Sequence, residues 1–330
     1  MEKQIALITG ASSGIGYATA LTLGKMGYDL IVVARRMDRL ESLVQALKTD
    51  PASSNTRVHA AVLDVRSLKA VKAFYEALPK EWKHIDVLVN NAGLAKGLSK
   101  FFDGDTDHWD QMIDTNVKGL LYVSRTVVPG MIAQGRGHVI NIGSIAGKEV
   151  YDNGNVYCGT KFAVDAITKS MRLELAVHGL KVTGIHPGAV ETEFSVVRFD
   201  VDVDRAKNVY KGYDNLVAED IAEAIGFVVT RKPHVNINDL VIMPQAQAVA
   251  VVGAGFIGLE LAAVARGMGL PMHVAETAVR PLARALSVPM ALHLQAFHEA
   301  QGTRFHLSAQ LAAIEGAHGH ATGLRLRDGS

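Results

Sequence analysis

Cysteine is almost missing from this chain of 330 residues, because Cys158 is the only one. An intrachain disulfide is therefore impossible, and a reducing compartment such as the cytoplasm fits. The chain also lacks a large excess of charge of either sign, since its net charge is +1. This balance gives no general attraction to nucleic acid or to an acidic membrane. The apolar run 249–261 is shorter than a membrane span and contains Glu260. We expect a cytoplasmic protein without a signal peptide, since strand-like residues begin at Gln4.

Short β-branched runs alternate with helical stretches up to residue 244. The expected helices include residues 14–26, 38–48, 67–78 and 155–177. Such an alternation predicts a parallel sheet with helices on both faces and right-handed crossovers. We therefore expect an α/β fold with a doubly wound, seven-stranded parallel sheet. Its strands are the runs IALIT, LIVVA, RVHAAVLDV, DVLVN, HVINIGS, KVTGIHPG and DLVIMP.

The first strand leads into the glycine-rich stretch TGASSGIG, with Thr9 and Gly10 at its carboxyl end. Open α/β sheets bind ligands at that edge. Gly10, Gly14 and Gly16 permit a tight turn and a close approach of the backbone to a pyrophosphate. The helix that follows offers free N–H groups and the positive end of its dipole. This order is typical of a Rossmann-type dinucleotide site, and the alternative is a plain strand–helix connection.

The end of the second strand bears on which dinucleotide is bound. NAD sites usually carry an acid there, which accepts a hydrogen bond from the ribose 2′-OH. This chain has Arg35 and Arg36 instead. Guanidinium groups bind a 2′-phosphate bidentately, so the sequence favours NADP. The alternative is that the two arginines begin an exposed helix, as we expect of Arg39.

Tyr157 and Lys161 stand four positions apart in a helical stretch, which puts them on one face. An unperturbed tyrosine has a pKa of about 10, too high for fast proton exchange at neutral pH, and a neighbouring ammonium lowers that pKa. Ser144 ends a strand where it can donate a hydrogen bond to a substrate carbonyl oxygen, and Asn116 can hold a water that relays protons from Lys161. Tyr-x-x-x-Lys alone occurs by chance in many helices, but the four residues together are specific.

Residues 1–246 resemble a short-chain dehydrogenase/reductase from end to end. The resemblance is carried, in that family's order, by TGASSGIG, Asp64, NNAG, Asn116, Ser144, YCGTK and Pro187-Gly188. It implies that Tyr157 is the general acid/base and that Ser144 orients the substrate. It implies that Lys161 lowers the tyrosine pKa and holds the nicotinamide ribose, with Asn116 keeping the relay. It also implies a homo-oligomer, a tetramer in this family.

The same resemblance implies which residues bind NADP. Asp64 would contact the adenine, Asn90 the adjoining ribose region and Thr192 the carboxamide. The alternatives are a helix N-cap for Asp64 and purely structural roles for Asn90 and Asn91. The expected cofactor residues are Thr9, Gly10, Ser12, Ser13, Gly14, Ile15, Gly16, Arg35, Arg36, Asp64, Val65, Asn91, Ala92, Gly93, Tyr157, Lys161, Pro187, Gly188, Val190 and Thr192.

Within that family, VETEFSVVRF and HVNINDLVIMP resemble the NADP-dependent 3-hydroxy acid dehydrogenases, which oxidise serine and related short 3-hydroxy acids. This implies a cation near the nicotinamide that anchors the substrate carboxylate. The candidates are Lys148 and Arg198, the latter on an expected lid at 190–214. The alternative is that both are plain surface charges. We interpret Cys158 as a small helix residue rather than a nucleophile. Two alternatives stay open: a general carbonyl or alcohol reductase, and an NADP-binding regulatory protein whose tail docks a partner.

The tail carries a second glycine motif, Gly253-x-Gly255-x-x-Gly258, after an apolar strand. Residues 249–330, in an expected domain 247–330, resemble a truncated NAD-binding segment of FAD-dependent, ferredoxin-reductase-like oxidoreductases, with Glu276 in the place of an NAD-selective acid. Neither an FAD-binding fold nor a cysteine pair accompanies it. We therefore expect an incomplete second βαβ unit, fused behind one working nucleotide site, whose first strand is an exposed edge. No metal site is expected, since His318 and His320 lack further ligands.

Overall fold

The computed structural model describes residues 3–151, 153–194, 215–244, 249–267, 272–317 and 320–327. The chain divides into two compact units. The first comprises Met1–Lys211 and Asn215–Pro244, and the second Gly212–Asp214 and Gln245–Ser330. Each unit is described by itself.

The first unit is built on one parallel sheet of seven strands, in the order β3-β2-β1-β4-β5-β6-β9. The fold prediction is thereby confirmed. The strand β1 lies near the middle and pairs with β2 and β4, so that its carboxyl end faces the ends of both neighbours. The strands are β1 (Ile5–Thr9), β2 (Asp29–Ala34), β3 (Val58–Val62), β4 (Ile85–Asn90), β5 (His138–Ile142), β6 (Lys181–Pro187) and β9 (Asp239–Ile242).

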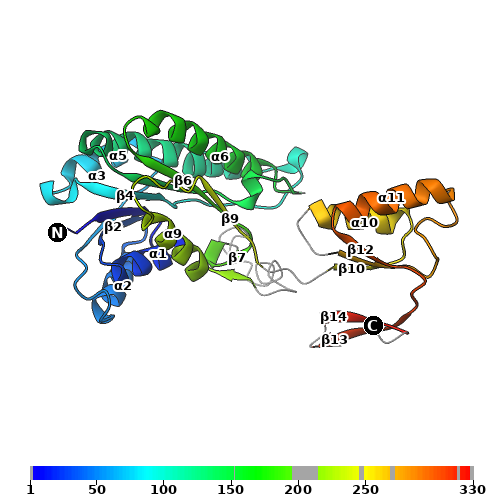
Figure 1. Ribbon diagram of the computed structural model, residues 1–330. Helices are drawn as coiled ribbons and strands as arrows, with labels where there is room; N and C mark the ends of the chain where they lie inside the picture. Colours follow the sequence, from blue (N-terminus) through cyan, green and yellow to red (C-terminus); the bar gives the residue numbers. More distant parts are fainter. Residues whose placement is uncertain are drawn as a thin grey trace. The chain divides into compact units, whose positions relative to one another are not determined.

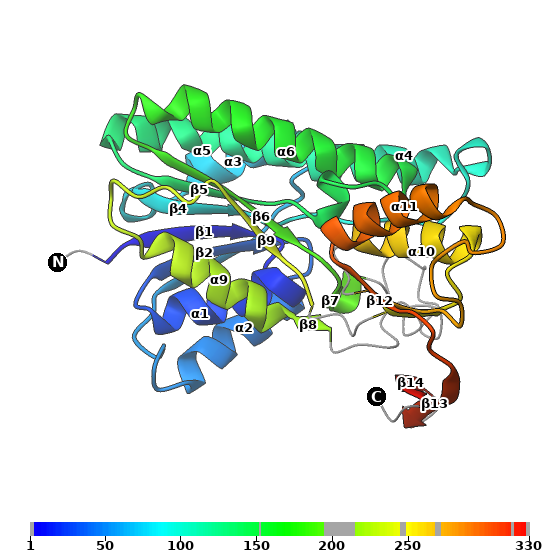
Figure 2. The same ribbon diagram turned by 45° about the vertical axis from the view of Figure 1, so that its right-hand side comes forward.

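Helices cover both faces of this sheet, as Figure 1 shows: α1, α2 and α9 on one side, and α3, α5 and α6 on the other. Figure 2 shows α4 along the same side as α6, and the two helices pack together. A two-stranded sheet of β7 (Val190–Glu191) and β8 (Leu216–Val217) lies outside the main sheet. The helices are α1 (Gly14–Lys25), α2 (Met37–Thr49), α3 (Leu68–Ala77), α4 (Thr106–Ile113), α5 (Leu120–Gln134), α6 (Asn155–Ala176) and α9 (Ala218–Val229).

The central strands separate two apolar cores because successive strand side chains point to opposite faces. Along β1, Ala6 and Ile8 join the core beneath α1, α2 and α9, whereas Ile5 and Leu7 join the core beneath α3 and α5. Every residue of β1, β2 and β4 is buried. Two-sided burial explains why these strands read as nearly continuous apolar runs in the sequence. It also makes the sheet a rigid platform for the loops at its carboxyl edge.

The second unit begins with the predicted strand, glycine turn and helix: β10 (Val249–Val252) and α10 (Phe256–Gly267). With β11 (Met272–Ala275), α11 (Val288–Ala300) and β12 (Thr303–His306) it forms a parallel sheet in the order β10-β11-β12. An antiparallel hairpin of β13 (Leu311–Ala317) and β14 (His320–Leu326) follows. Within the described part of this sheet β10 is an edge strand, as the sequence led us to expect.

Candidate active site

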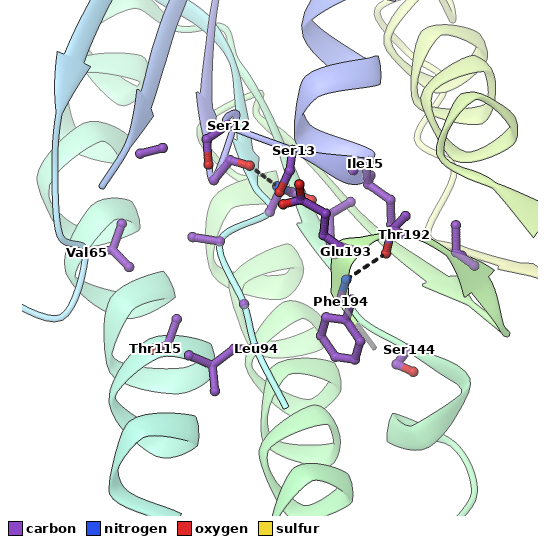
Figure 3. A pocket seen from close by; sticks show the side chains of 18 of the residues that line it. Ser12, Ser13, Ile15, Val65, Leu94, Thr115, Ser144, Thr192, Glu193 and Phe194 are labelled. Atoms are coloured by element: carbon purple, nitrogen blue, oxygen red, sulfur yellow. Dashed lines mark hydrogen bonds between the residues drawn. The ribbon is translucent and has the colours of Figure 1, made fainter. Parts of the chain in front are cut away.

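A cavity of about 350 Å³ opens at the carboxyl edge of the main sheet, where β1, β2, β4, β5 and β6 end (Figure 3). Most of the residues that the sequence assigned to the site meet there. Thr9, Gly16 and Asn116 lie outside the lining. The predicted residues that line the cavity are Gly10, Ser12, Ser13, Gly14, Ile15, Arg35, Arg36, Asp64, Val65, Asn91, Ala92, Gly93, Ser144, Tyr157, Lys161, Pro187, Gly188, Val190 and Thr192.

The glycine turn between β1 and α1 has the backbone that its sequence predicts. Gly10 and Gly14 have φ angles of +66° and +53°, a region that other residues avoid. Gly16 does not have a positive φ angle. A methyl group on it would, however, collide with the Gly10 carbonyl and the Asn91 amide. The turn therefore needs glycine at all three positions, and it leaves the first N–H groups of α1 at the cavity.

Thr9 and Asn91 hold this turn from behind. The Thr9 hydroxyl accepts hydrogen bonds from the backbone N–H groups of Asn91 and Ala92, both at 3.0 Å. The Asn91 amide donates to the carbonyls of Thr9 at 2.9 Å and Gly10 at 3.1 Å. Asn90 points into the sheet, where its amide donates to Ser124 and Asn141. These contacts agree with the structural alternative for Asn90, while Asn91 both supports the turn and lines the cavity.

Ser144, Tyr157 and Lys161 come together on the opposite wall of the cavity. Ser144 follows β5, and its Oγ accepts a hydrogen bond from Ala146 N–H at 3.1 Å, which fixes the hydroxyl at the strand end. Tyr157 and Lys161 lie one turn apart on α6, with Lys161 Nζ 5.9 Å from the centroid of the tyrosine ring. All three side chains are at least nine-tenths buried. The wall therefore combines a hydroxyl, a phenol and an ammonium in a poorly hydrated place.

Lys161 Nζ donates a hydrogen bond to the Ile142 carbonyl at 2.9 Å. Burial lowers the pKa of Lys161 from 10.5 to about 8, because the charged form loses hydration. The ammonium is still the main form at neutral pH. An ammonium this weakly solvated exerts a stronger field on its neighbours than an exposed one would.

Asn116 sits in a π-helical turn, Asp114–Gly119, between α4 and α5. π-turns often occur at functional sites. The Asn116 Oδ1 accepts a hydrogen bond from Leu94 N–H at 2.8 Å, and its amide donates to the Leu94 carbonyl and to the Thr160 hydroxyl. A Cβ on Gly93 would lie 3.3 Å from Asn116 Oδ1 and 3.8 Å from Lys161 Nζ, so only glycine leaves the space between them open. The proton relay through Asn116 stays a prediction.

Arg36, at the end of β2, points to the glycine turn. Its Nη2 lies 3.2 Å from the Ser13 hydroxyl and 3.4 Å from the Ser12 hydroxyl. The same atom donates to the Glu193 carboxylate at 3.0 Å. Arg35 also lines the cavity. These groups form a positively charged, hydroxyl-rich corner where the sequence predicted recognition of a 2′-phosphate.

Asp64 lies at the cavity wall, but it does not cap a helix. Ser67 is the N-cap of α3 and accepts from Ala70 N–H, so the N-cap alternative for Asp64 is wrong. The Asp64 carboxylate is instead paired with Arg66, with its shortest contact at 2.6 Å. The hydrogen bond from the Arg66 side chain lowers the pKa of Asp64. Arg66 lines the cavity and was missed from the sequence.

Lys148 does not reach the cavity. A short 3₁₀ turn after Ser144, Ile145–Gly147, carries it toward Asp165, whose carboxylate lies 2.6 Å from Nζ. Asp165, His186 and Asp239 bring possible metal ligands within 4.8 Å of one another, but Lys148, Lys169 and Arg172 already neutralise the two carboxylates. Lys148 is therefore part of an ion-pair cluster rather than a substrate anchor. Arg198 lies outside the described residues.

Two further residues at the cavity were missed, although the sequence analysis quoted the motif that contains them. Glu193 and Phe194 follow Thr192 and line the cavity. Figure 3 shows Thr192, Glu193 and Phe194 as consecutive residues whose side chains project into it. The Phe194 ring packs against Tyr157 with a centroid distance of 5.7 Å. An apolar ring therefore lies beside the expected reactive phenol.

Comparisons with known proteins agree with this geometry. Residues 4–200 match the family model for short chain dehydrogenase. An NADP-dependent 3-hydroxy acid dehydrogenase of Salmonella typhi is 43% identical over 247 residues, which cover 74% of this chain and 97% of the relative. The chain belongs to the short-chain dehydrogenase family. It is accordingly an oxidoreductase, and the predictions of family and enzyme class are confirmed.

Two more relatives define the similarity further. Sulfoacetaldehyde reductase 2 of Chromohalobacter salexigens is 42% identical over 247 residues, or 74% of this chain and 96% of that protein. A closed form of serine dehydrogenase complexed with NADP⁺ superposes with a TM-score of 0.69 at 42% identity, covering 73% of this chain and 95% of the other.

The tail has its own match to a known family. Residues 248–329 match the family model for pyridine nucleotide-disulphide oxidoreductase, in agreement with the second resemblance. Among the described residues, every helix is too short or too polar to cross a membrane.

Proposed function

We propose that this protein is an NADP-dependent oxidoreductase that transfers a hydride between nicotinamide and a small 3-hydroxy acid such as serine. The observation that carries the proposal is the single cavity at whose walls the glycine turn, Arg36 and the group Ser144, Tyr157 and Lys161 all lie. A general carbonyl or alcohol reductase would use the same wall. A regulatory protein that only binds NADP would have no need of a buried phenol beside an ammonium.

The residues at the cavity fit a dinucleotide phosphate. The glycine turn carries no Cβ at Gly10 or Gly14 and brings backbone N–H groups to the cavity, as a pyrophosphate requires. The corner of Arg36, Ser12 and Ser13 supplies donors for a 2′-phosphate, and β2 ends without an acid. NADP as cofactor is the part of this proposal that the relatives confirm, since they are NADP-dependent dehydrogenases. When bound, NADP supplies or accepts the hydride.

The chain's own residues move the proton and orient the substrate. Tyr157 gives its hydroxyl proton to the carbonyl oxygen in reduction and takes it back in oxidation. Lys161, 5.9 Å from the ring, stabilises the phenolate that forms. In this proposal Ser144 turns its Oγ–H from the Pro187 carbonyl, 3.5 Å away, to the same substrate oxygen, while its Oγ keeps the hydrogen bond from Ala146 N–H. Phe194 covers the phenol and excludes water from the transfer.

The substrate's acid group is a separate part of the proposal. Two of the relatives act on compounds that bear an anionic group, by their names a 3-hydroxy acid and sulfoacetaldehyde. With Lys148 committed to Asp165, another cation must face the substrate. A small hollow shares Tyr157 with the main cavity, and Lys96 lines it. Lys96 at this hollow and Arg198, which lies outside the described residues, are our candidates for the anchor.

A substrate panel tests this function. L-serine and other short 3-hydroxy acids, their amides and simple alcohols are offered with NADP and with NAD, and turnover is followed by nicotinamide absorbance. We expect the acids to exceed their amides with NADP, because a site built for a carboxylate leaves its cation unpaired with an amide. An alcohol that wins by a wide margin would favour the general reductase, and binding of NADP without turnover of any compound would favour the regulatory protein.

The tail, the assembly and the compartment complete the proposal. We assign residues 1–246 to the catalytic domain and residues 247–330 to a fused βαβ segment of NAD-binding type that takes no part in the reaction. We further propose a homotetramer in the cytoplasm, as the family resemblance implies. Sedimentation of the full chain tests the tetramer.

A further inference from the structure

The Glu193 carboxylate contacts Arg36, one of the two arginines expected to bind the 2′-phosphate. Glu193 Oε2 is 3.0 Å from Arg36 Nη2, and Glu193 Oε1 is 3.8 Å from Arg39 Nη2. Figure 3 shows Glu193 beside Ser13 at the glycine turn. Residues 36 and 193 come from the end of β2 and from the segment after β7. The contact is thus a tertiary one between the nucleotide-binding half of the cavity and the segment that covers Tyr157.

The carboxylate is charged. The hydrogen bond from Arg36 lowers the pKa of Glu193, with smaller contributions from Arg39 and Ser13. Both ends of the pair are partly exposed, with 44% of the Arg36 side chain and 42% of the Glu193 side chain accessible. A pair this accessible is weakly held, so another anion can replace one partner.

A phosphate monoester uses the same donors as this carboxylate. Both are anionic acceptors that match the fork of a guanidinium. The Ser12 and Ser13 hydroxyls lie 3.4 and 3.2 Å from Arg36 Nη2, the atom that donates to Glu193. Together with Arg36 they offer a group of hydrogen-bond donors to an anion. A dianionic phosphate and a carboxylate on one guanidinium repel each other, so the two anions exclude each other.

We propose that Glu193 is a specificity-determining residue that competes with the 2′-phosphate of NADP for Arg36. The inference rests on the proposed cofactor and goes beyond it. NAD carries a 2′-hydroxyl in place of the phosphate, and a hydroxyl can donate a hydrogen bond to a carboxylate. Glu193 therefore lowers the affinity for NADP and leaves the affinity for NAD unchanged or raises it. The preference for NADP over NAD that Arg36 creates becomes smaller as a result. In effect, the acid that β2 lacks is supplied from the other side of the cavity.

Glu193→Gln tests the competition, because it removes the charge and keeps the shape. Glu191→Gln is the matched control: Glu191 is exposed, lies two positions earlier on β7 and does not line the cavity. Calorimetric titration of the full chain measures the Kd values of NADP, NAD and adenosine 2′,5′-bisphosphate. The bisphosphate contains the phosphate in question but no nicotinamide, so Phe194 and Tyr157 do not affect its binding.

We expect Glu193→Gln to lower the Kd values of NADP and the bisphosphate about two- to fivefold, which is the range of an exposed ion pair. The Kd of NAD should stay unchanged or rise slightly. The effect should vanish when Arg36→Ala is also present. Unchanged or weaker NADP binding by Glu193→Gln, or equal tightening of NADP and NAD, would overturn the competition while leaving the proposed function intact. A wild type that binds no NADP would overturn the proposed function, and the competition with it.

Discussion

Lys161 Nζ lies 5.9 Å from the centroid of the Tyr157 ring and donates its hydrogen bond to the Ile142 carbonyl at the end of β5. The helix α6 and the strand β5 therefore fix one ammonium between a strand end and a phenol. The same burial that strengthens the effect of this charge on Tyr157 also makes the charge costly to the fold.

Lys161→Met should consequently stabilise the fold at neutral pH. The pKa of Lys161 is lowered by burial to about 8 in the folded chain from 10.5, so the folded state resists protonation. The penalty is fully present below pH 8 and disappears as the pH rises toward 10.5. At about 1.4 kcal/mol per pKa unit, less the lost hydrogen bond to Ile142, we expect a gain of about 1–3 kcal/mol at pH 7.

Urea denaturation of the wild type and the variant at several pH values checks this. The difference in the free energy of unfolding between the two proteins should be largest at pH 7 and should shrink toward zero as the pH rises from 8 to 10.5. A difference that stays constant across that window would mean that the Lys161 pKa is not lowered by the fold.

Removing both guanidinium groups at the end of β2 should change the cofactor preference. Arg35→Ala with Arg36→Ala is expected to raise the KM for NADP at least about tenfold and to leave the KM for NAD nearly unchanged, since a hydrogen bond to a charged group contributes about 1.5–3 kcal/mol. Lys48→Ala, an exposed change near the end of α2, is the control for a general loss of positive charge. Equal effects on both cofactors would show that the arginines do not bind the 2′-phosphate.

Gly16→Ala should abolish tight cofactor binding. The added methyl group would collide with the Gly10 carbonyl and the Asn91 amide, and both belong to the turn. Gly159→Ala is the matched control, since a Cβ there meets nothing within 4 Å on the exposed side of α6. We expect that control to bind NADP normally and to gain up to about 1 kcal/mol of stability from the better helix propensity of alanine. If Gly16→Ala binds NADP as tightly as Gly159→Ala does, the turn does not need glycine at position 16 to bind the cofactor.

Ending the chain at Gln247 should preserve NADP-dependent activity, because every described residue of the cavity comes before residue 195. The shorter chain should also aggregate less, since it lacks β10, an edge strand within the described sheet of the second unit. Turnover and light scattering of the two chains at equal concentration measure both effects. An inactive short chain would mean that the tail is a functional domain.

The parts of the site that the sequence predicted are those whose geometry is local. The turn around Gly10, Gly14 and Gly16 follows from a strand and a helix joined by glycines, and the spacing of Tyr157 and Lys161 follows from the helical repeat. The seven parallel strands were accessible as well, because apolar runs that alternate with helices are typical of a doubly wound sheet.

The parts that the sequence did not predict depend on tertiary contacts. Glu193 reaches Arg36 across 157 positions of the chain, and no local pattern marks that pair. Lys148 follows Ser144 closely in sequence, which made it a candidate anchor, but the intervening 3₁₀ turn carries it to Asp165. The π-turn that contains Asn116 likewise arises within a helical stretch whose sequence shows no glycine or proline before it.

The central claim is that Tyr157 moves the proton of an alcohol–carbonyl conversion. Its most direct test is Tyr157→Phe beside the wild type and Tyr122→Phe, a change on the outer helix α5, assayed with L-serine and short 3-hydroxy acids in the presence of NADP. We expect kcat to fall about 10²- to 10⁴-fold in Tyr157→Phe alone, with the Kd of NADP nearly unchanged, because only the proton donor is lost. Turnover by Tyr157→Phe equal to that of the wild type would contradict the mechanism.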